Sequence, residues 1–221
     1  MKKSNGRVKE ILTAVGVGVA FMVLALILQI ITQELPSIFI ILKYGLGTGE
    51  TILKSFEFSR PLLYSLFIGG TAAGYQEVMK YFAVGGSKNY LAAWVGLGFA
   101  LVDVAVLIVE VAPRLPTQAP LLLVTLSGVN ILSSLLFHPG TAMILKYGRY
   151  SGKGGYFLLF TILLHGTIDG GLVFTDIFVI KNSGLYFQAT AVFWVMAMVI
   201  SVASFLAGRR YMAKIAPVGV G

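Results

Sequence analysis

Five ionisable side chains stand in segments of this sequence that are otherwise apolar enough to lie in lipid. They are Glu77, Asp103, His138, His165 and Asp169. Charged groups are costly inside a membrane, so they usually face a bundle interior or a water-filled cavity and mark functional sites. Carboxylates and imidazoles are also the groups that activate water, transfer protons and bind metal ions. We therefore expect these side chains to form one site.

The local spacing of the groups supports a shared site. Glu77 and Lys80 are three residues apart, and His165 and Asp169 are four apart, so each pair lies on one face of a helix. A polar stripe at steps of three and four surrounds the first histidine and consists of Ser127, Asn130, Ser134, His138 and Thr141. Such a stripe is better buried against a polar cavity than against lipid.

Two kinds of chemistry suit these residue types. In a low-dielectric cavity a carboxylate such as Glu77 is more basic than in water and can activate a water molecule, while a histidine or an amine stabilises the oxyanion. Alternatively, His138, His165 and Glu77 make a three-ligand set for a zinc ion. The spacing lacks an HExxH signature. We therefore expect no metal cofactor, with zinc as the alternative.

The composition identifies the class of protein that carries these groups. The chain has 221 residues, of which 57% are hydrophobic and 12% charged, and its mean hydropathy is +0.87. Soluble domains are about 25% charged. The net charge of +8 is concentrated at segment ends, without the basic stripe and stacking aromatics of a nucleic-acid-binding domain. The absence of cysteine excludes disulfides and thiolate-bound metal.

The apolar runs predict an all-α polytopic membrane helix bundle, in one integral-membrane domain over residues 1–221. Six transmembrane helices are expected at about 8–31, 60–84, 90–111, 120–146, 155–180 and 185–207. The apolar patch from Leu35 to Leu46 is too short to cross a bilayer, and the residues after it mix charged and apolar side chains. A re-entrant or interfacial segment is therefore expected over about 35–58.

The distribution of basic residues predicts the orientation. Six crossings put both termini on one side, with twelve basic residues on that side and five on the other; the five are Lys43, Lys54, Arg60, Arg114 and Lys181. The positive-inside rule then places both termini in the cytoplasm. At 1.5 Å per residue, the five ionisable groups lie about 10 to 20 Å from the cytoplasmic ends of four helices. This agreement predicts one cavity in the cytoplasmic half of the membrane.

Four short motifs, in order along consecutive helices, resemble those of the glutamic-type intramembrane proteases. The motifs are Glu-x-x-Lys at Glu77, Gly-Leu-Gly-Phe-Ala-Leu-Val-Asp ending at Asp103, Phe-His at His138, and Leu-His-Gly-Thr-Ile-Asp from His165 to Asp169. That superfamily includes the PrsW and YhfC-like proteins and the type II CAAX prenyl endopeptidases. The resemblance covers about half of the chain, and it implies hydrolysis of a transmembrane or lipidated peptide.

One departure from the family pattern implies an alternative function. The family usually has two adjacent glutamates, and here the first position is Gln76. Gln-Glu-Val followed by a basic residue is similar to the anterior-pharynx-defective subunit of γ-secretase, a member of the same superfamily that is a non-proteolytic scaffold. The resemblance therefore implies either an intramembrane endopeptidase or an inactive scaffold that binds a partner transmembrane helix.

The enzyme hypothesis gives each residue a role. Glu77 acts as the acid and base, His138 and His165 stabilise the oxyanion or orient water, and Asp169 orients His165. Lys80 balances charge. Gln76, Asp103 and Asn130 support these groups. The expected partners are membrane lipid and a membrane-associated peptide or helix, with no nucleic acid.

Overall fold

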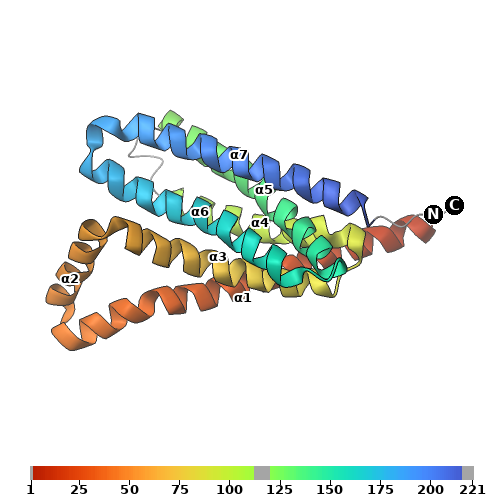
Figure 1. Cartoon of the computed structure of the whole chain (residues 1–221), viewed down its shortest axis with the longest axis horizontal. Coiled ribbons are helices and arrows are strands. Elements are labelled where there is room, and N and C mark those ends of the chain that lie inside the picture. The colour runs from red at the N-terminus through yellow and green to blue at the C-terminus, as the bar shows by residue number, and fades with distance from the viewer. Residues whose placement is uncertain (1, 112–119, 216–221) are drawn as a thin grey trace. The chain divides into compact units, whose positions relative to one another are not determined.

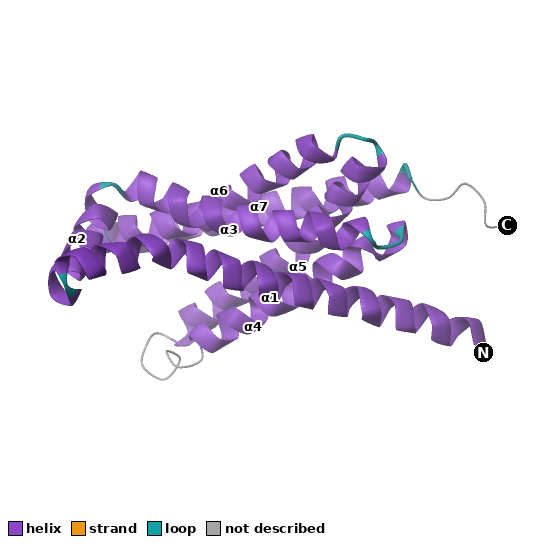
Figure 2. Ribbon diagram, turned by 90° about the horizontal axis from the view of Figure 1, so that it is seen from below, coloured by secondary structure: helices purple, strands orange, loops and turns teal. Residues whose placement is uncertain are grey.

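All regular elements of the protein are helices within residues 2–111 and 120–215, which are the residues that the computed structural model describes (Figures 1 and 2). No strand occurs in these two ranges. The predicted all-α class is therefore confirmed. The predicted connection after residue 111, with the Arg114 used for the orientation, lies outside the described residues.

Seven α-helices and two short 3₁₀ turns are described in these ranges. They are α1 (Lys2–Tyr44), α2 (Leu46–Ser59), α3 (Pro61–Gly85), η1 (Asn89–Leu91), α4 (Ala92–Val111), α5 (Pro120–Tyr150), α6 (Gly154–Lys181), η3 (Ser183–Leu185) and α7 (Tyr186–Ala213). Five of the described helices, α1, α4, α5, α6 and α7, are long and apolar enough to cross a membrane. These helices indicate a membrane-embedded protein.

The sixth predicted span, α3, forms as a helix but is not among those five. Its glycines and the polar residues of its C-terminal half lower its hydropathy, because they replace the large apolar side chains that the other helices carry. Two of these polar residues, Glu77 and Lys80, are the ionisable groups of α3 in the predicted site. Six crossings therefore stay a prediction.

The first helix differs from the prediction. We expected a helix that ends near residue 31 and a separate segment from 35, but α1 continues without a break to Tyr44. Pro36 removes one backbone hydrogen bond, to the carbonyl of Thr32, and the apolar residues that follow it keep the helical conformation. At 43 residues, α1 is about 64 Å long, roughly twice the thickness of a bilayer core. Only α2 is separate, after Gly45 with its positive φ of 80°.

The chain divides into two compact units. Unit 1 comprises residues 1–23, 78–161 and 194–221, and unit 2 comprises residues 24–77 and 162–193. The divisions fall inside α1, α3, α6 and α7, so each of these helices contributes to both units. The expectation of a single domain stays a prediction.

In unit 2, small residues bring α3 and α6 into close contact. A Cβ on Gly69 would lie only 2.2 Å from the backbone nitrogen of Gly170, and a Cβ on Gly166 would lie 3.7 Å from the Cβ of Ala73. Large side chains would keep these backbones apart, so this face of α3 packs on α6 because it is thin. The helix α2 joins α1 to α3 in the same unit (Figure 1).

In unit 1, α4 packs closely on α5 at Gly96. A Cβ at this position would lie 2.4 Å from the carbonyl oxygen of His138 and 2.5 Å from the Cα of Pro139. On α5, the hydroxyl of Ser133 forms a 2.7 Å hydrogen bond with that of Ser201 on α7. Close backbone approach and a buried polar bond are the two means by which helices associate in lipid.

Candidate functional site

Three ionisable groups of unit 2 lie in a row on α3 and α6. His165 Nδ1 on α6 is 2.8 Å from Glu77 Oε1 on α3. The other ring nitrogen, Nε2, is 3.4 Å from Asp169 Oδ2, one turn further along α6. The Glu77 side chain is fully buried and that of His165 is 5% exposed, whereas that of Asp169 is 30% exposed. We call this row of three side chains the Glu–His–Asp array.

The packing of α3 on α6 explains how the array forms. Gly69, Ala73 and Glu77 are spaced four residues apart and therefore share one face of α3. Gly69 and Ala73 are small enough for that face to approach α6 closely. Two turns after the closest approach, Glu77 reaches the imidazole of His165. The array is thus a consequence of the small residues that precede it in the sequence.

Gln76, the neighbour of Glu77, is engaged with α1. Its amide Nε2 donates a 3.1 Å hydrogen bond to Oε1 of Gln29, and its side chain is buried. Further along α1, the hydroxyl of Thr32 is 2.8 Å from that of Tyr75, and Gln33 donates to the carbonyl of Ile68. These bonds fix α1 against α3 beside the array.

A second group of buried polar side chains lies in unit 1, around Lys80. The Lys80 ammonium donates a 2.9 Å hydrogen bond to Thr141 Oγ1 on α5. It also lies 5.3 Å from the ring centre of Phe99 and 5.6 Å from that of Phe137. The side chain is fully buried. Aromatic faces attract a cation at such distances, so these rings stabilise the buried charge.

His138 and Asp103 also meet in unit 1, less closely than the groups of the array. His138 Nε2 is 3.6 Å from Asp103 Oδ2, which is outside hydrogen-bonding distance. The His138 side chain is buried, and that of Asp103 is 39% exposed. Asn130, at the other end of the predicted stripe, is half-buried on α5.

The structure therefore brings the predicted residues together in two sets. Glu77, His165 and Asp169 meet in unit 2, and Asp103 meets His138 in unit 1, where Lys80 also lies. That all of them line one cavity stays a prediction. Sequence reasoning missed the partners on α1, although Gln29, Thr32 and Gln33 recur at steps of three and four in an apolar run, which is the signal used for the stripe on α5.

The alternative zinc ligands, His138, His165 and Glu77, are divided between the two units, so a zinc site stays a prediction. Within unit 2, both ring nitrogens of His165 face carboxylate oxygens. No group of three or more histidine, aspartate and glutamate side chains suited to a metal occurs in the described part of the chain. We therefore derive no step that passes through a metal.

Comparison with known proteins returns no match. No protein-family model, no curated protein and no solved structure matches this chain. The resemblance to glutamic-type intramembrane proteases stays a prediction.

Proposed function

We propose that this protein is a membrane-embedded endopeptidase that hydrolyses a membrane-associated peptide, with both termini in the cytoplasm and the site in the cytoplasmic half of the bilayer. The observation that supports this proposal is the Glu–His–Asp array, in which a buried imidazole lies between two carboxylates at 2.8 and 3.4 Å. A histidine held in this way is suited to take a proton from water and pass it on.

The exposures of the three side chains suggest how the roles divide. Glu77 is fully buried and accepts the Nδ1–H of His165, which fixes the ring and its tautomer. Nε2 then carries the lone pair, at the end of the array where Asp169 is 30% exposed. A water molecule there gives its proton to Nε2 while its oxygen bonds to the peptide carbonyl carbon. The carbon–nitrogen bond then breaks, and the proton passes to the leaving amine.

This division refines the role that the sequence assigned to Glu77. The sequence-based hypothesis made Glu77 itself the acid and base and Asp169 the orienting group. The burial of Glu77 favours the orienting role for it, because a group that activates water must be reached by water. Asp169, the exposed member, holds the attacking water beside His165.

A cleavage assay tests the proposal. The full chain and the variants Gln76→Glu, Glu77→Ala and His165→Ala are reconstituted in proteoliposomes with a library of fluorogenic membrane peptides. We expect cleavage by the unaltered chain, increased by Gln76→Glu and abolished by Glu77→Ala and His165→Ala. Glu50→Ala is the matched control, since Glu50 is an exposed glutamate on α2 of the same unit. Absence of cleavage in the unaltered chain and in Gln76→Glu would refute the proposal.

A second candidate function is favoured by the bond between Gln76 and Gln29. The residue in place of the family's first glutamate is neutral and makes a hydrogen bond to α1, as expected of a residue with a packing role. In this function the protein is an inactive scaffold that binds a partner transmembrane helix. Co-purification of one stoichiometric membrane partner, together with no cleavage by any variant, supports the scaffold over the enzyme.

A further inference from the structure

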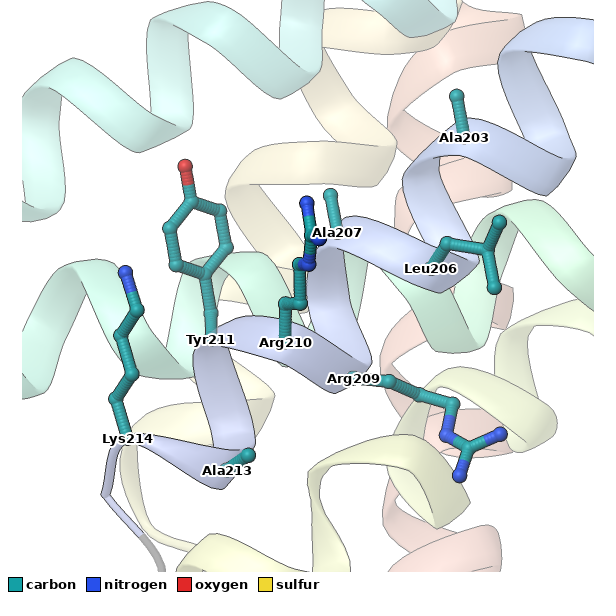
Figure 3. Close-up of a pocket in the computed structure, with 8 residues that line it drawn as sticks. All are labelled: Ala203, Leu206, Ala207, Arg209, Arg210, Tyr211, Ala213 and Lys214. Carbon is teal, nitrogen blue, oxygen red and sulfur yellow. The ribbon is translucent and has the colours of Figure 1, made fainter.

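The C-terminal end of α7 carries a hollow whose chemistry the candidate site does not use. The hollow has a volume of about 850 Å³. Its lining includes three cations, Arg209, Arg210 and Lys214, together with Tyr211 and the apolar side chains of Leu206 and Ala207. Figure 3 shows Arg210, Tyr211 and Lys214 pointing the same way from the helix, with Arg209 at another edge. All these residues belong to unit 1.

The two arginines have no protein counter-charge within the described residues. Both side chains are exposed, and neither forms an ion pair or a hydrogen bond with a described residue. Two other basic side chains of unit 1 have partners within the chain: Lys88 pairs with Glu10 at 2.7 Å, and Lys146 donates to the carbonyl of Val84 at 2.9 Å. The lining of the hollow contains no acidic residue. Its charge is therefore available to an anion from outside the chain.

Tyr211, which lines the hollow, stacks on a second tyrosine, Tyr147. The rings of Tyr211 and Tyr147 are stacked, with centres 4.6 Å apart and planes 17° from parallel. The Lys214 ammonium lies 5.3 Å from the Tyr211 ring centre and 5.9 Å from that of Tyr147. The stacking holds Tyr211 in place, and the ammonium is held next to it. Cations beside tyrosine are typical of the interface between a membrane and water.

The position of the hollow along α7 indicates that its ligand also has an apolar part. The apolar stretch from Ser183 to Ala213 is long enough to cross a membrane, and the hollow lies at its end. Leu206, which is 56% exposed, and the alanines one and two turns before Tyr211 continue the lining toward the middle of this stretch. A ligand that matches the whole lining is anionic at one end and apolar at the other.

We propose that this hollow binds an anionic phospholipid. The phosphate lies between Arg210 and Lys214, with Arg209 at the edge, and an acyl chain lies along Leu206 and the neighbouring alanines. Free phosphate shares the headgroup chemistry but has no part that would contact the apolar lining, so the lining favours the lipid as the source. This proposal is independent of whether the Glu–His–Asp array is catalytic.

Native mass spectrometry of the full-length protein in detergent micelles tests the proposal, since binding in micelles does not depend on topology. The probes are phosphatidylglycerol, phosphatidylcholine and inorganic phosphate. Arg210→Gln/Lys214→Gln removes the two cations that flank Tyr211, and Ala207→Trp fills the hollow while keeping every charge. Lys43→Gln/Lys54→Gln is the matched control, because it removes two exposed positive charges from unit 2.

We expect phosphatidylglycerol to bind in preference to phosphatidylcholine, and Arg210→Gln/Lys214→Gln to weaken its binding by about thirty-fold. Ala207→Trp should weaken it as well, and Lys43→Gln/Lys54→Gln should leave it unchanged. Three results would overturn the proposal: equal loss in Lys43→Gln/Lys54→Gln, equal binding of the two lipids, or displacement of phosphatidylglycerol by an equal concentration of inorganic phosphate.

Discussion

The two units use a buried histidine in different ways. In unit 2, His165 has a carboxylate at each ring nitrogen, at 2.8 and 3.4 Å. In unit 1, His138 is 3.6 Å from one carboxylate, and its ring lies against aromatic rings, with centres 5.7 Å from Phe137 and 6.2 Å from Phe99. The imidazole between two carboxylates is the arrangement that the proposed proton path uses.

The buried charged groups Glu77 and Lys80 also differ in the contacts described for them. Glu77 in unit 2 bonds to a side chain that can itself take up or release a proton. Lys80 in unit 1 donates to the hydroxyl of Thr141, and its ammonium lies near the rings of Phe99 and Phe137. Both groups are buried, so the following predictions test which of them acts in the reaction.

The largest effect is expected from Glu77→Gln. The glutamine amide can donate to Nδ1 of His165, which moves the ring proton to Nε2 and removes the base. The corresponding change in a serine protease triad costs about 10⁴ in rate, and we expect peptide cleavage to fall by a similar factor. Initial rates on the best fluorogenic peptide measure this.

The control for this change is Glu50→Gln on α2, whose side chain is exposed. Its rate should equal that of the unaltered chain. If Glu77→Gln keeps more than a tenth of the rate, the proposed proton path through His165 is wrong. The difference between the surroundings of His165 and His138 then has no consequence for cleavage.

The next effect concerns the packing that forms the array. Gly69→Ala places a Cβ 2.2 Å from the Gly170 nitrogen, so α3 and α6 must separate. Overpacking of this kind costs about 1–3 kcal/mol, and a displacement near 1 Å can cost about 100-fold in rate. Gly96→Ala in unit 1 meets the His138 carbonyl oxygen at 2.4 Å and should destabilise the protein by a similar amount with a smaller loss of rate.

The neighbouring glycine provides the control for both changes. A Cβ on Gly70 has no other atom within 4 Å, so Gly70→Ala should keep the rate and raise stability by up to about 1 kcal/mol. Thermal unfolding in detergent and the cleavage rate are measured on the same samples. Equal loss of rate in Gly69→Ala and Gly96→Ala would show that unit 1 is as important for cleavage as the array.

Helical periodicity in the sequence was enough to predict some of the contacts in the site. The pair His165 and Asp169 follows from a spacing of four on a helix, and their 3.4 Å approach confirms it. The stripe on α5 contains Thr141, which does meet another polar group, the ammonium of Lys80.

What the sequence could not supply is the choice of partner between helices. The pairing of Glu77 with His165, and of Lys80 with Thr141, depends on which helices are neighbours and in which register, and spacing along one helix does not contain that information. The end of α1 was misplaced for a local reason. Pro36 removes one hydrogen bond, and the apolar residues after it were sufficient to continue the helix to Tyr44.

A smaller effect is expected from Thr141→Val, which keeps the shape of the side chain and removes the acceptor for the Lys80 ammonium. Hydrogen bonds to charged groups contribute about 1.5–3 kcal/mol. We expect the free energy of unfolding to decrease by an amount in that range. Thr13→Val is the control in the same unit, since Thr13 is exposed and bonds only to the carbonyl of Lys9 one turn earlier. An equal effect of the two changes would mean that the bond from Lys80 to Thr141 contributes little to stability.

The smallest effects should come from the two exposed carboxylates, one in each unit. Asp169→Asn keeps the size of the side chain and removes the charge 3.4 Å from Nε2 of His165, so it weakens both the hold on the attacking water and the stabilisation of the imidazolium. Because the second carboxylate, that of Glu77, remains beside the imidazole, we expect a loss of about tenfold in rate. Asp103→Asn makes the same chemical change 3.6 Å from His138, where no proton path is proposed, and should lower the rate by less than about threefold.

The two rates are compared across pH 5 to 9, because a group that acts through the imidazole changes the pH dependence as well as the rate. Asp169→Asn should therefore move the profile, because the imidazolium loses a neighbouring negative charge. Asp103→Asn should leave the profile in place. If Asp103→Asn moves the profile and Asp169→Asn does not, His138 is the base and the roles of the two units must be exchanged.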